Sequence, residues 1–280
     1  MDLSIIIINY NTQLLTRQCI DSIYEKTHDI QFEVILVDNA STDGSKEYFE
    51  KDSRIKYIYN NDNLGFGKAN NIGYEHSTGD IVLCLNSDTI VINGILKDMV
   101  QFIRESPNDI GVFGTILFDN ANKPNVSSGS FPLWYNEFLI KKHKKNSRPF
   151  DKVGVVDYIT GADLFVRRGH VEELGLFDPD FFMYYEDTEL CYRYKQKGYN
   201  SFIADKRGII HLEGASGTNS YRRTKTMTES YFTYMSKTLP KFKWKLVRTL
   251  ILFRRFFTTW KYDWTIKEKA AYFNSMIKHK

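Results

Sequence analysis

Carboxylate side chains follow an apolar or aromatic run at two separate places in this 280-residue chain. At the first, an uninterrupted apolar run over 81–85 ends at Asn86 and is followed two residues later by Asp88. A carboxylate there is a natural ligand for Mg²⁺ or Mn²⁺, and the cation would hold phosphate oxygens. At the second, Glu186 and Asp187 follow a segment rich in Phe and Tyr, where loss of water would raise the basicity of a carboxylate. The two places predict a cation site and a proton-accepting group.

Both places also have an ordinary structural explanation. Asp88 would equally well cap a helix that begins near Asn93, because Asp is common at helix starts. Glu186 and Asp187 open a predicted helix, and the helix dipole alone favours acidic residues in a first turn. The aromatic neighbourhood of the second pair is what favours a functional role for it.

Four β-branched, apolar runs in the first part of the chain predict strands that alternate with helices. These runs cover 3–8, 32–37, 55–59 and 81–85. Strand, helix and strand in succession form a right-handed βαβ unit, and runs without polar alternation are typical of a parallel sheet covered on both faces. Ligands of such sheets bind beyond the carboxyl ends of the strands. Asn9, Asp38 and Asp88 are therefore expected at one edge of the sheet.

A loop with several glycines follows the third predicted strand and leads into a helix. Its pattern is not a dinucleotide-binding motif, because Asn70 stands where the third glycine is required and the loop does not follow the first strand. Backbone N–H groups at such a helix start would still bind phosphate. Turn chemistry alone would explain Gly65 and Gly67 about as well.

The second half of the chain predicts a strand interrupted at Gly161, a helix over 186–197, and two short strands over 201–204 and 208–211. A glycine inside a strand indicates a bend or a close backbone approach. His211, at the end of the last strand, is either a structural residue or a ligand.

Composition and charge indicate an ordinary globular protein with a distinct C-terminal segment. The formal charge of +4 divides into +9 for residues 241–280 and −5 for the rest. Three cysteines without CxxC spacing favour reduced thiols and a cytoplasmic location. The first residues do not resemble a signal sequence, and the chain has no apolar stretch of about 18 residues.

Four segments taken together resemble the family 2 glycosyltransferases with the GT-A fold. The segments are Val37–Ser45, Asn63–Asn71, Asn86–Asp88 and Glu186–Cys191. Within the family the chain is most similar to the bacterial rhamnosyltransferase branch, which also has the Gly161–Ala162 strand and a late His. The resemblance covers about residues 1–220. It implies an α/β fold with a mostly parallel central sheet, flanking helices and a C-terminal helical extension over 221–280. A nucleotide-binding half would cover about 1–118 and an acceptor-binding half about 153–220.

The resemblance also implies roles for individual residues. Residues expected to bind the nucleotide-sugar are Asn9, Tyr10, Asp38, Asn39, Asn63, Gly67, Asn70, Asn86 and Asp88. Residues expected near the acceptor are Gly161, Ala162 and Tyr185. Asp88 and His211 would hold a divalent cation, Mn²⁺ or Mg²⁺. The family's DxD metal motif begins with Asp, whereas this chain has Asn86, so Asp88 is the sole carboxylate of the triplet.

The implied reaction is an inverting sugar transfer. A dTDP- or UDP-linked sugar, with rhamnose as one candidate, would react with a hydroxyl of a glycan or lipid-linked saccharide in bacterial surface-polysaccharide synthesis. Asp187 is the expected base, and Glu186 is the second candidate. Two other functions stay open: a sugar-phosphate nucleotidyltransferase and an inactive sugar-nucleotide-binding scaffold.

The C-terminal extension combines basic residues with an apolar helical face. Leu246, Leu250, Phe253, Phe257 and Trp260 share that face. It would bind anionic lipid at the inner surface of the cell membrane, or pack against the domain or against a second subunit in a homodimer. Nucleic-acid binding is not expected, because no recognition module is present.

Overall fold

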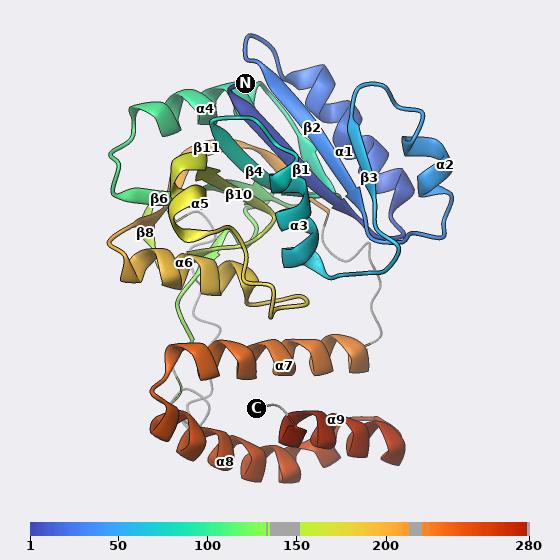
Figure 1. Cartoon of the computed structure of the whole chain (residues 1–280), viewed down its shortest axis with the longest axis vertical. Coiled ribbons are helices and arrows are strands. Elements are labelled where there is room, and N and C mark those ends of the chain that lie inside the picture. Colours follow the sequence, from blue (N-terminus) through green and yellow to red (C-terminus); the bar gives the residue numbers. More distant parts are fainter. Residues whose placement is uncertain (133, 135–151, 213–219, 279–280) are drawn as a thin grey trace.

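A mixed sheet forms the centre of the upper part of the molecule (Figure 1). The computed structural model describes residues 1–132, 134, 152–212 and 220–278. The main strands are β1 (Leu3–Asn9), β2 (Phe32–Asp38), β3 (Lys56–Tyr59), β4 (Ile81–Asn86), β5 (Thr89–Val91), β6 (Ile110–Phe118), β8 (Gly154–Val156), β10 (Asp163–Arg167) and β11 (Asn200–His211). Their order is β3-β2-β1-β4-β10-β6-β11-β5, with β8 paired to β11. Two short strands, β7 (Ser128–Gly129) and β9 (Tyr158–Ile159), pair separately.

The first four strands of this order are parallel, as the apolar runs predicted. Their register brings Asn9 opposite Asp38 and Ile8 opposite Asn86. The carboxyl ends of β1, β2 and β4 therefore lie at the same edge of the sheet. β1 is buried on both faces, which explains its unbroken run of isoleucines.

The other half of the sheet combines a parallel pair, β6 and β11, with antiparallel pairs. β10 lies between β4 and β6 and is antiparallel to both, with Asp163 opposite Leu85. The two short strands predicted over 201–211 are one strand, β11, whose register against β6 shifts between Ile203 and Arg207. Because β10 runs in the opposite direction, its first residues begin at the edge where β4 ends.

Helices cover both faces of the sheet (Figure 1). They are α1 (Gln13–Lys26), α2 (Ser45–Phe49), α3 (Phe66–Glu75), α4 (Ile95–Glu105), α5 (Arg168–Leu174) and α6 (Glu186–Gln196). Ile5 and Ile7 pack with Ile20 of α1, whereas Ile6 packs with Ala69 of α3. Successive residues of a strand point to opposite faces, so β1 contributes to both cores.

Three further helices form a separate layer below the sheet and its helices (Figure 1). They are α7 (Ser220–Thr238), α8 (Lys241–Thr258) and α9 (Ile266–Lys278), with a short 3₁₀ turn, η2 (Thr259–Lys261), after α8. Their core includes Phe232, Trp244 and Tyr272, and it also takes in Phe181 from the loop before α6. In the described part of the chain, none of the helices combines the length and the apolar character needed to cross a bilayer.

Candidate active site

Polar side chains at the ends of β1 and β2 form a buried hydrogen-bond network. The Asn9 amide donates to the Asp38 carboxylate at 2.8 Å and to the Ser41 hydroxyl at 3.0 Å. The other carboxylate oxygen of Asp38 accepts from the Ser41 backbone N–H at 2.7 Å. Asn9 and Asp38 are fully buried, so they support the backbone at this edge of the sheet from below its surface. Their expected contact with a nucleotide stays a prediction, and Tyr10 beside them is 49% exposed.

A second set of hydrogen bonds connects Asn9 and Asp38 to the end of β4. The Thr12 hydroxyl donates to Asn9 at 2.9 Å and lies 3.2 Å from the Ser87 hydroxyl. Asn39 is held by its own bond to the Gly65 carbonyl at 3.1 Å. One connected hydrogen-bond network therefore joins the ends of the three parallel strands.

Asp88 and His211 meet just beyond the end of β4. Nε2 of His211 lies 3.2 Å from a carboxylate oxygen of Asp88 and 3.4 Å from the Asn86 amide. The His211 side chain is 13% exposed and the Asp88 side chain is 15% exposed, so a ligand can reach both. A hollow of about 290 Å³ opens beside His211 and is also lined by Asp119 and Asn125. The register of β5 against β11 positions this pair, since His211 lies opposite Thr89.

These side chains fit a cation only in part. Among the residues that the structure describes, no group of three or more His, Cys, Asp and Glu side chains is arranged to hold a metal ion. Asp88 and His211 supply one oxygen and one nitrogen, which leaves most of a six-coordinate shell to water and to diphosphate oxygens. Mg²⁺ bound through one or two carboxylates and substrate phosphates is a common arrangement in proteins. The pair therefore fits a cation that arrives with its nucleotide.

Glu186 and Asp187 form the first turn of α6 at the same sheet edge. One Asp187 oxygen accepts from the Gly161 backbone N–H at 3.1 Å, and the other accepts from the Thr188 N–H at 2.6 Å. The carbonyl of Ala162, next to Gly161, accepts from the Asn86 N–H at 3.0 Å. These bonds connect Asp187 with Asn86, which is followed in the sequence by Ser87 and Asp88.

Burial changes the acidity of both α6 carboxyls. Burial raises the pKa of Asp187, and the hydrogen bonds from Thr188 and Gly161 only partly oppose it. Burial and then the neighbouring Asp187 charge raise the pKa of Glu186. A carboxylate with a raised pKa is a better proton acceptor near neutral pH. Asp187 is also the more accessible of the two, because Glu186 is only 6% exposed.

The glycine loop before α3 has a packing role in this structure. The φ of Gly65 is +84°, and a Cβ there would lie 2.1 Å from the Phe182 carbonyl oxygen. A Cβ on Gly67 would lie 3.1 Å from the Phe177 Cβ. Asn63 accepts from the Gly65 N–H at 3.0 Å, and Asn70 is fully buried. These residues let α3 pack closely on the 177–182 segment, and their nucleotide contacts stay a prediction.

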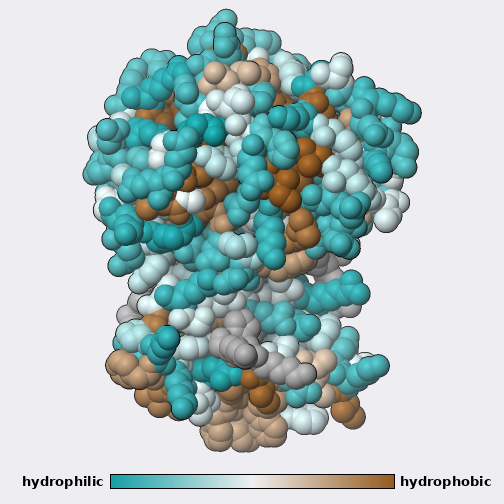
Figure 2. All heavy atoms as spheres, in the orientation of Figure 1, coloured by the Kyte–Doolittle hydropathy of each residue, from teal (hydrophilic) through white to brown (hydrophobic). Residues whose placement is uncertain are grey.

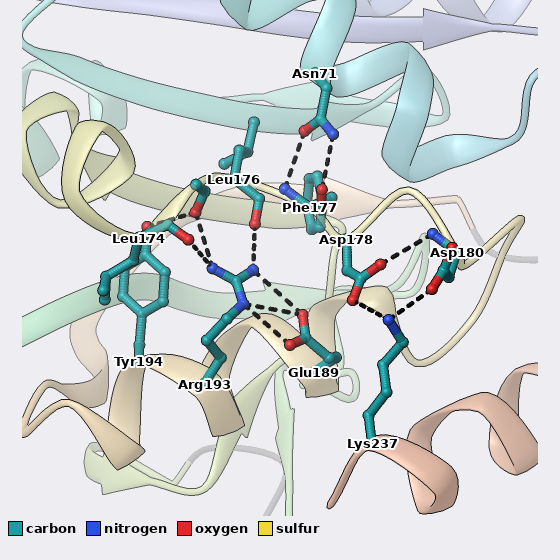
Figure 3. Close-up of polar contacts among 11 residues, drawn as sticks. Asn71, Leu174, Leu176, Phe177, Asp178, Asp180, Glu189, Arg193, Tyr194 and Lys237 are labelled. Carbon is teal, nitrogen blue, oxygen red and sulfur yellow. Dashed lines mark hydrogen bonds and ion pairs between the residues drawn. The ribbon is translucent and has the colours of Figure 1, made fainter.

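Residues that the sequence did not reveal fasten the loop before α6, as Figure 3 shows. The Asn71 amide forms two bonds with the Phe177 backbone, at 2.7 and 3.0 Å. The Arg193 guanidinium donates to the Leu176 carbonyl at 2.7 Å and to Glu189. Lys237 of α7 contacts Asp178 and Asp180, each at 2.7 Å. Apart from Glu189 and Arg193, which lie four residues apart on α6, these pairs join distant segments and leave no periodic signal in a sequence.

The fastened loop ends in two residues with unusual backbone conformations. Tyr184 and Tyr185, which directly precede Glu186, have φ values of +71° and +68°. Such left-handed conformations are costly for aromatic residues and persist only where the surroundings impose them. The Tyr185 ring packs against Tyr231 and Tyr234 of α7, and Ser230 donates to the Met183 carbonyl at 2.7 Å. α7 therefore helps to hold the residue that precedes Glu186 and Asp187.

Asp163 is a further buried carboxyl that the sequence analysis did not single out. Its side chain accepts from the Thr115 N–H at 2.8 Å and from the Thr115 hydroxyl at 2.5 Å. Complete burial raises its pKa to about 7, which the bonds from Thr115 and the charge of nearby His211 only partly oppose. An acidic residue inside an apolar strand run, as in 162–166, is the signal that could have revealed it.

Comparisons with known proteins identify the family of the chain. The model of glycosyl transferase family 2 matches residues 4–175, which is more than half of the chain. The low-salt glycan biosynthesis hexosyltransferase Agl10 of Haloferax volcanii is 28% identical over 227 residues, 78% of this chain and 69% of that protein. The glycosyltransferase GlyG of Streptococcus pneumoniae is 26% identical over 43% of this chain and only 41% of its own length.

Solved structures share the fold at low identity. The mannosyltransferase PcManGT of Pyrobaculum calidifontis, in complex with GDP-Man and Mn²⁺, has a TM-score of 0.61 and 17% identity, over 96% of this chain and 73% of that one. TarS 1–349 of S. aureus, in complex with UDP-GlcNAc, has a TM-score of 0.59 and 17% identity, over 98% and 79%. The expected GT-A type α/β fold is confirmed, and the chain belongs to glycosyl transferase family 2.

Proposed function

We propose that this glycosyltransferase moves a sugar from a nucleotide-diphosphate-sugar to a hydroxyl group, with inversion at the anomeric carbon and Asp187 as the base. The observation that carries the proposal is the position of the Asp187 carboxylate. It is oriented by the Gly161 and Thr188 N–H groups, and bonds through Ala162 connect it to the strand end that delivers Asp88.

In the proposed reaction, the acceptor oxygen forms a bond to the anomeric carbon as the bond from that carbon to the diphosphate oxygen breaks. The acceptor proton moves to Asp187, and the nucleoside diphosphate leaves. Asp88 and His211 would hold a divalent cation, which when bound neutralises the charge that develops on the diphosphate. Tyr10, which is exposed, and Ser87, which is partly exposed, would receive the nucleoside and sugar.

The finer substrate assignment rests on chemistry and on similarity. PcManGT binds GDP-Man and TarS binds UDP-GlcNAc, so a nucleotide-sugar donor is supported for a chain with this fold. We propose a UDP- or dTDP-linked hexose or deoxyhexose such as rhamnose. The acceptor would be a glycan or lipid-linked saccharide, and Gly161, Ala162 and Tyr185 would lie beside it.

The proposal predicts that Asp187→Asn nearly abolishes transfer while nucleotide binding persists. Asn keeps the shape and can still accept from Gly161, but it cannot take a proton, so the rate should fall roughly 10²–10⁴-fold. Single-turnover transfer and calorimetric titration with the nucleoside diphosphate measure the two properties. The matched variant Asp88→Ala should instead weaken the binding of nucleotide that depends on Mn²⁺.

Transfer at the wild-type rate by Asp187→Asn would disprove the assignment of the base. The products distinguish the other functions: a nucleotidyltransferase releases pyrophosphate, whereas a sugar transfer releases nucleoside diphosphate. An inactive scaffold would show neither transfer nor hydrolysis of any donor it binds.

A further inference from the structure

Helix α8 has two apolar faces, and the residues that the structure describes cover only one of them. Trp244, Val247 and Ile251 face the core of the helical layer, and the Trp244 ring contacts Phe232 of α7. A second set of apolar side chains lies on the other side of the helix, and we call it the apolar stripe. It consists of Phe242, Leu246, Leu250, Phe253 and Phe257, which are 42–80% exposed.

The spacing of the apolar stripe shows that it is one continuous surface. Its members follow one another at intervals of four, four, three and four residues, which places them on a single helical face. The stripe covers 15 residue steps, or about 22 Å of helix. Trp260 extends it and is 62% exposed. Figure 2 shows hydrophobic spheres along the lower margin of the helical layer, where Figure 1 places α8.

Basic side chains border the apolar stripe on both sides. At 100° per residue, exposed Lys245 lies on one side of it and exposed Arg254 on the other, and exposed Lys241 and Lys261 lie at the two ends of α8. The sequence of α8 contains no acidic residue. An apolar face with flanking Lys and Arg is the pattern of helices that lie in a membrane interface, with their apolar side chains among the acyl chains and their charges at anionic headgroups.

From this complementarity we propose that α8 docks the protein on the surface of an anionic lipid bilayer. A second copy of the chain is a poorer occupant, because a two-fold interface brings the same patch of each subunit together and would oppose the two basic borders. The membrane supplies both the apolar medium and the negative charge. Docked in this way, α8 would lie parallel to the surface, with α7 between it and the loop that carries Tyr185 (Figure 1).

Flotation of the full chain with lipid vesicles tests this proposal. The chain should float with vesicles that contain phosphatidylglycerol and remain unbound with vesicles of phosphatidylcholine alone. High salt should reduce the binding, since it screens the attraction. The double variant Phe253→Asp/Phe257→Asp should lose binding, because it places charge in the apolar stripe.

Two controls separate membrane docking from loss of the fold. Leu14→Asp is the matched control: Leu14 is 71% exposed on α1, far from α8 in Figure 1, and this variant should bind vesicles as wild type does. The variant Lys241→Gln/Lys245→Gln/Lys261→Gln keeps the apolar stripe. Its partition onto anionic vesicles should fall roughly 100-fold, at about fivefold for each lysine. Thermal melting of each variant checks that it is folded.

Two outcomes would overturn the proposal. One is equal binding to neutral and anionic vesicles that salt does not change. The other is a chain that ignores both kinds of vesicle and sediments as a dimer, which the Phe253→Asp/Phe257→Asp variant converts to a monomer. In the second case the apolar stripe would be an interface between copies.

Discussion

At the scale of single residues, Glu186 and Asp187 are neighbours with different surroundings. Asp187 accepts hydrogen bonds from Gly161 and Thr188 through both oxygens. Glu186 is buried, and its Oε2 has no hydrogen-bond partner among the described residues. Because the Asp187 charge further raises the pKa of Glu186, Glu186 should keep its proton while Asp187 ionises. We therefore expect the two carboxyls to hold opposite protonation states near neutral pH.

We therefore predict that Glu186→Gln retains most of its transfer activity at neutral pH, since Gln resembles the protonated acid. If Asp187 is the base, its raised pKa should set the acid limb of the pH profile. Activity should be lost as the pH falls through that value, which lies above the ordinary Asp value of about 3.9, and the limb should stay in Glu186→Gln. Profiles of kcat/KM for both proteins measure this. A loss of activity comparable to that of Asp187→Asn would instead make Glu186 the base.

The buried Asp163 predicts a specific dependence of stability on pH. Its pKa is raised to about 7 in the folded protein, so the folded state keeps a proton that the unfolded chain has released above about pH 4. The protonated Asp163 therefore contributes fully to the free energy of unfolding below about pH 4. This contribution is lost as the pH rises from about 4 to about 7. Above pH 7 it should not change further.

Asp163→Asn removes this titration and can still accept from both Thr115 donors through its amide oxygen. We expect the variant to be more stable than wild type at pH 8, by about 2 kcal/mol after the cost of an unpaired amide N–H. The advantage should shrink toward pH 4. Urea unfolding at several pH values measures the difference, and a difference that is constant with pH would contradict the prediction.

At the scale of elements, the loop 177–185, which leads into Glu186 and Asp187, depends on contacts with α7. Lys237 anchors it through Asp178 and Asp180, and Tyr184 and Tyr185 follow in left-handed conformations. Each such conformation costs about 1–3 kcal/mol, so the loop needs its anchors to stay in place. The position of Asp187 then depends on contacts made about fifty residues later in the chain.

Lys237→Met should lower kcat/KM roughly fivefold, because a partly exposed ion pair contributes about 1 kcal/mol. Overall stability should change little. The matched control is Lys225→Met on the same helix, which removes a partly exposed ion pair with Glu229 at 3.7 Å. Steady-state kinetics and thermal melting of both variants make the comparison. Equal effects on transfer would show that the loop does not depend on Lys237.

At the scale of the whole molecule, the helical layer and the sheet with its helices share a core. Phe181 belongs to the loop before α6, yet it is fully buried in the cluster of α7, α8 and α9. Ser230 and Lys237 add polar bonds across the same junction. A shared apolar core makes the two layers lose their packing together.

The full chain should therefore unfold in a single cooperative thermal transition. Scanning calorimetry tests this directly: the calorimetric enthalpy should equal the van't Hoff enthalpy. Two resolved transitions would mean that the C-terminal helices fold independently of the sheet. In that case Phe181 would not couple the layers.

The sequence by itself determined the parallel half of the fold and the family. Apolar runs with strand length predicted β1, β2, β3 and β4, and parallel strands necessarily end at one edge, where Asn9, Asp38 and Asp88 lie. The order and spacing of four motifs identified the family, because such a set is specific where each motif alone is weak. Each of these signals consists of residues that are neighbours in the sequence, so the sequence alone is enough to recognise it.

Only the tertiary structure decided the rest. The antiparallel insertion of β10 brings Gly161 to Asp187, and long-range packing turns Asp38 inward and buries Asp163. The sequence showed one apolar face in the segment that forms α8. The packing of α8 shows two such faces, one buried in the helical layer and one that is the exposed apolar stripe. Periodicity reports which residues share a face of an element. It does not report which neighbour covers that face, because pairing between distant segments depends on the whole fold.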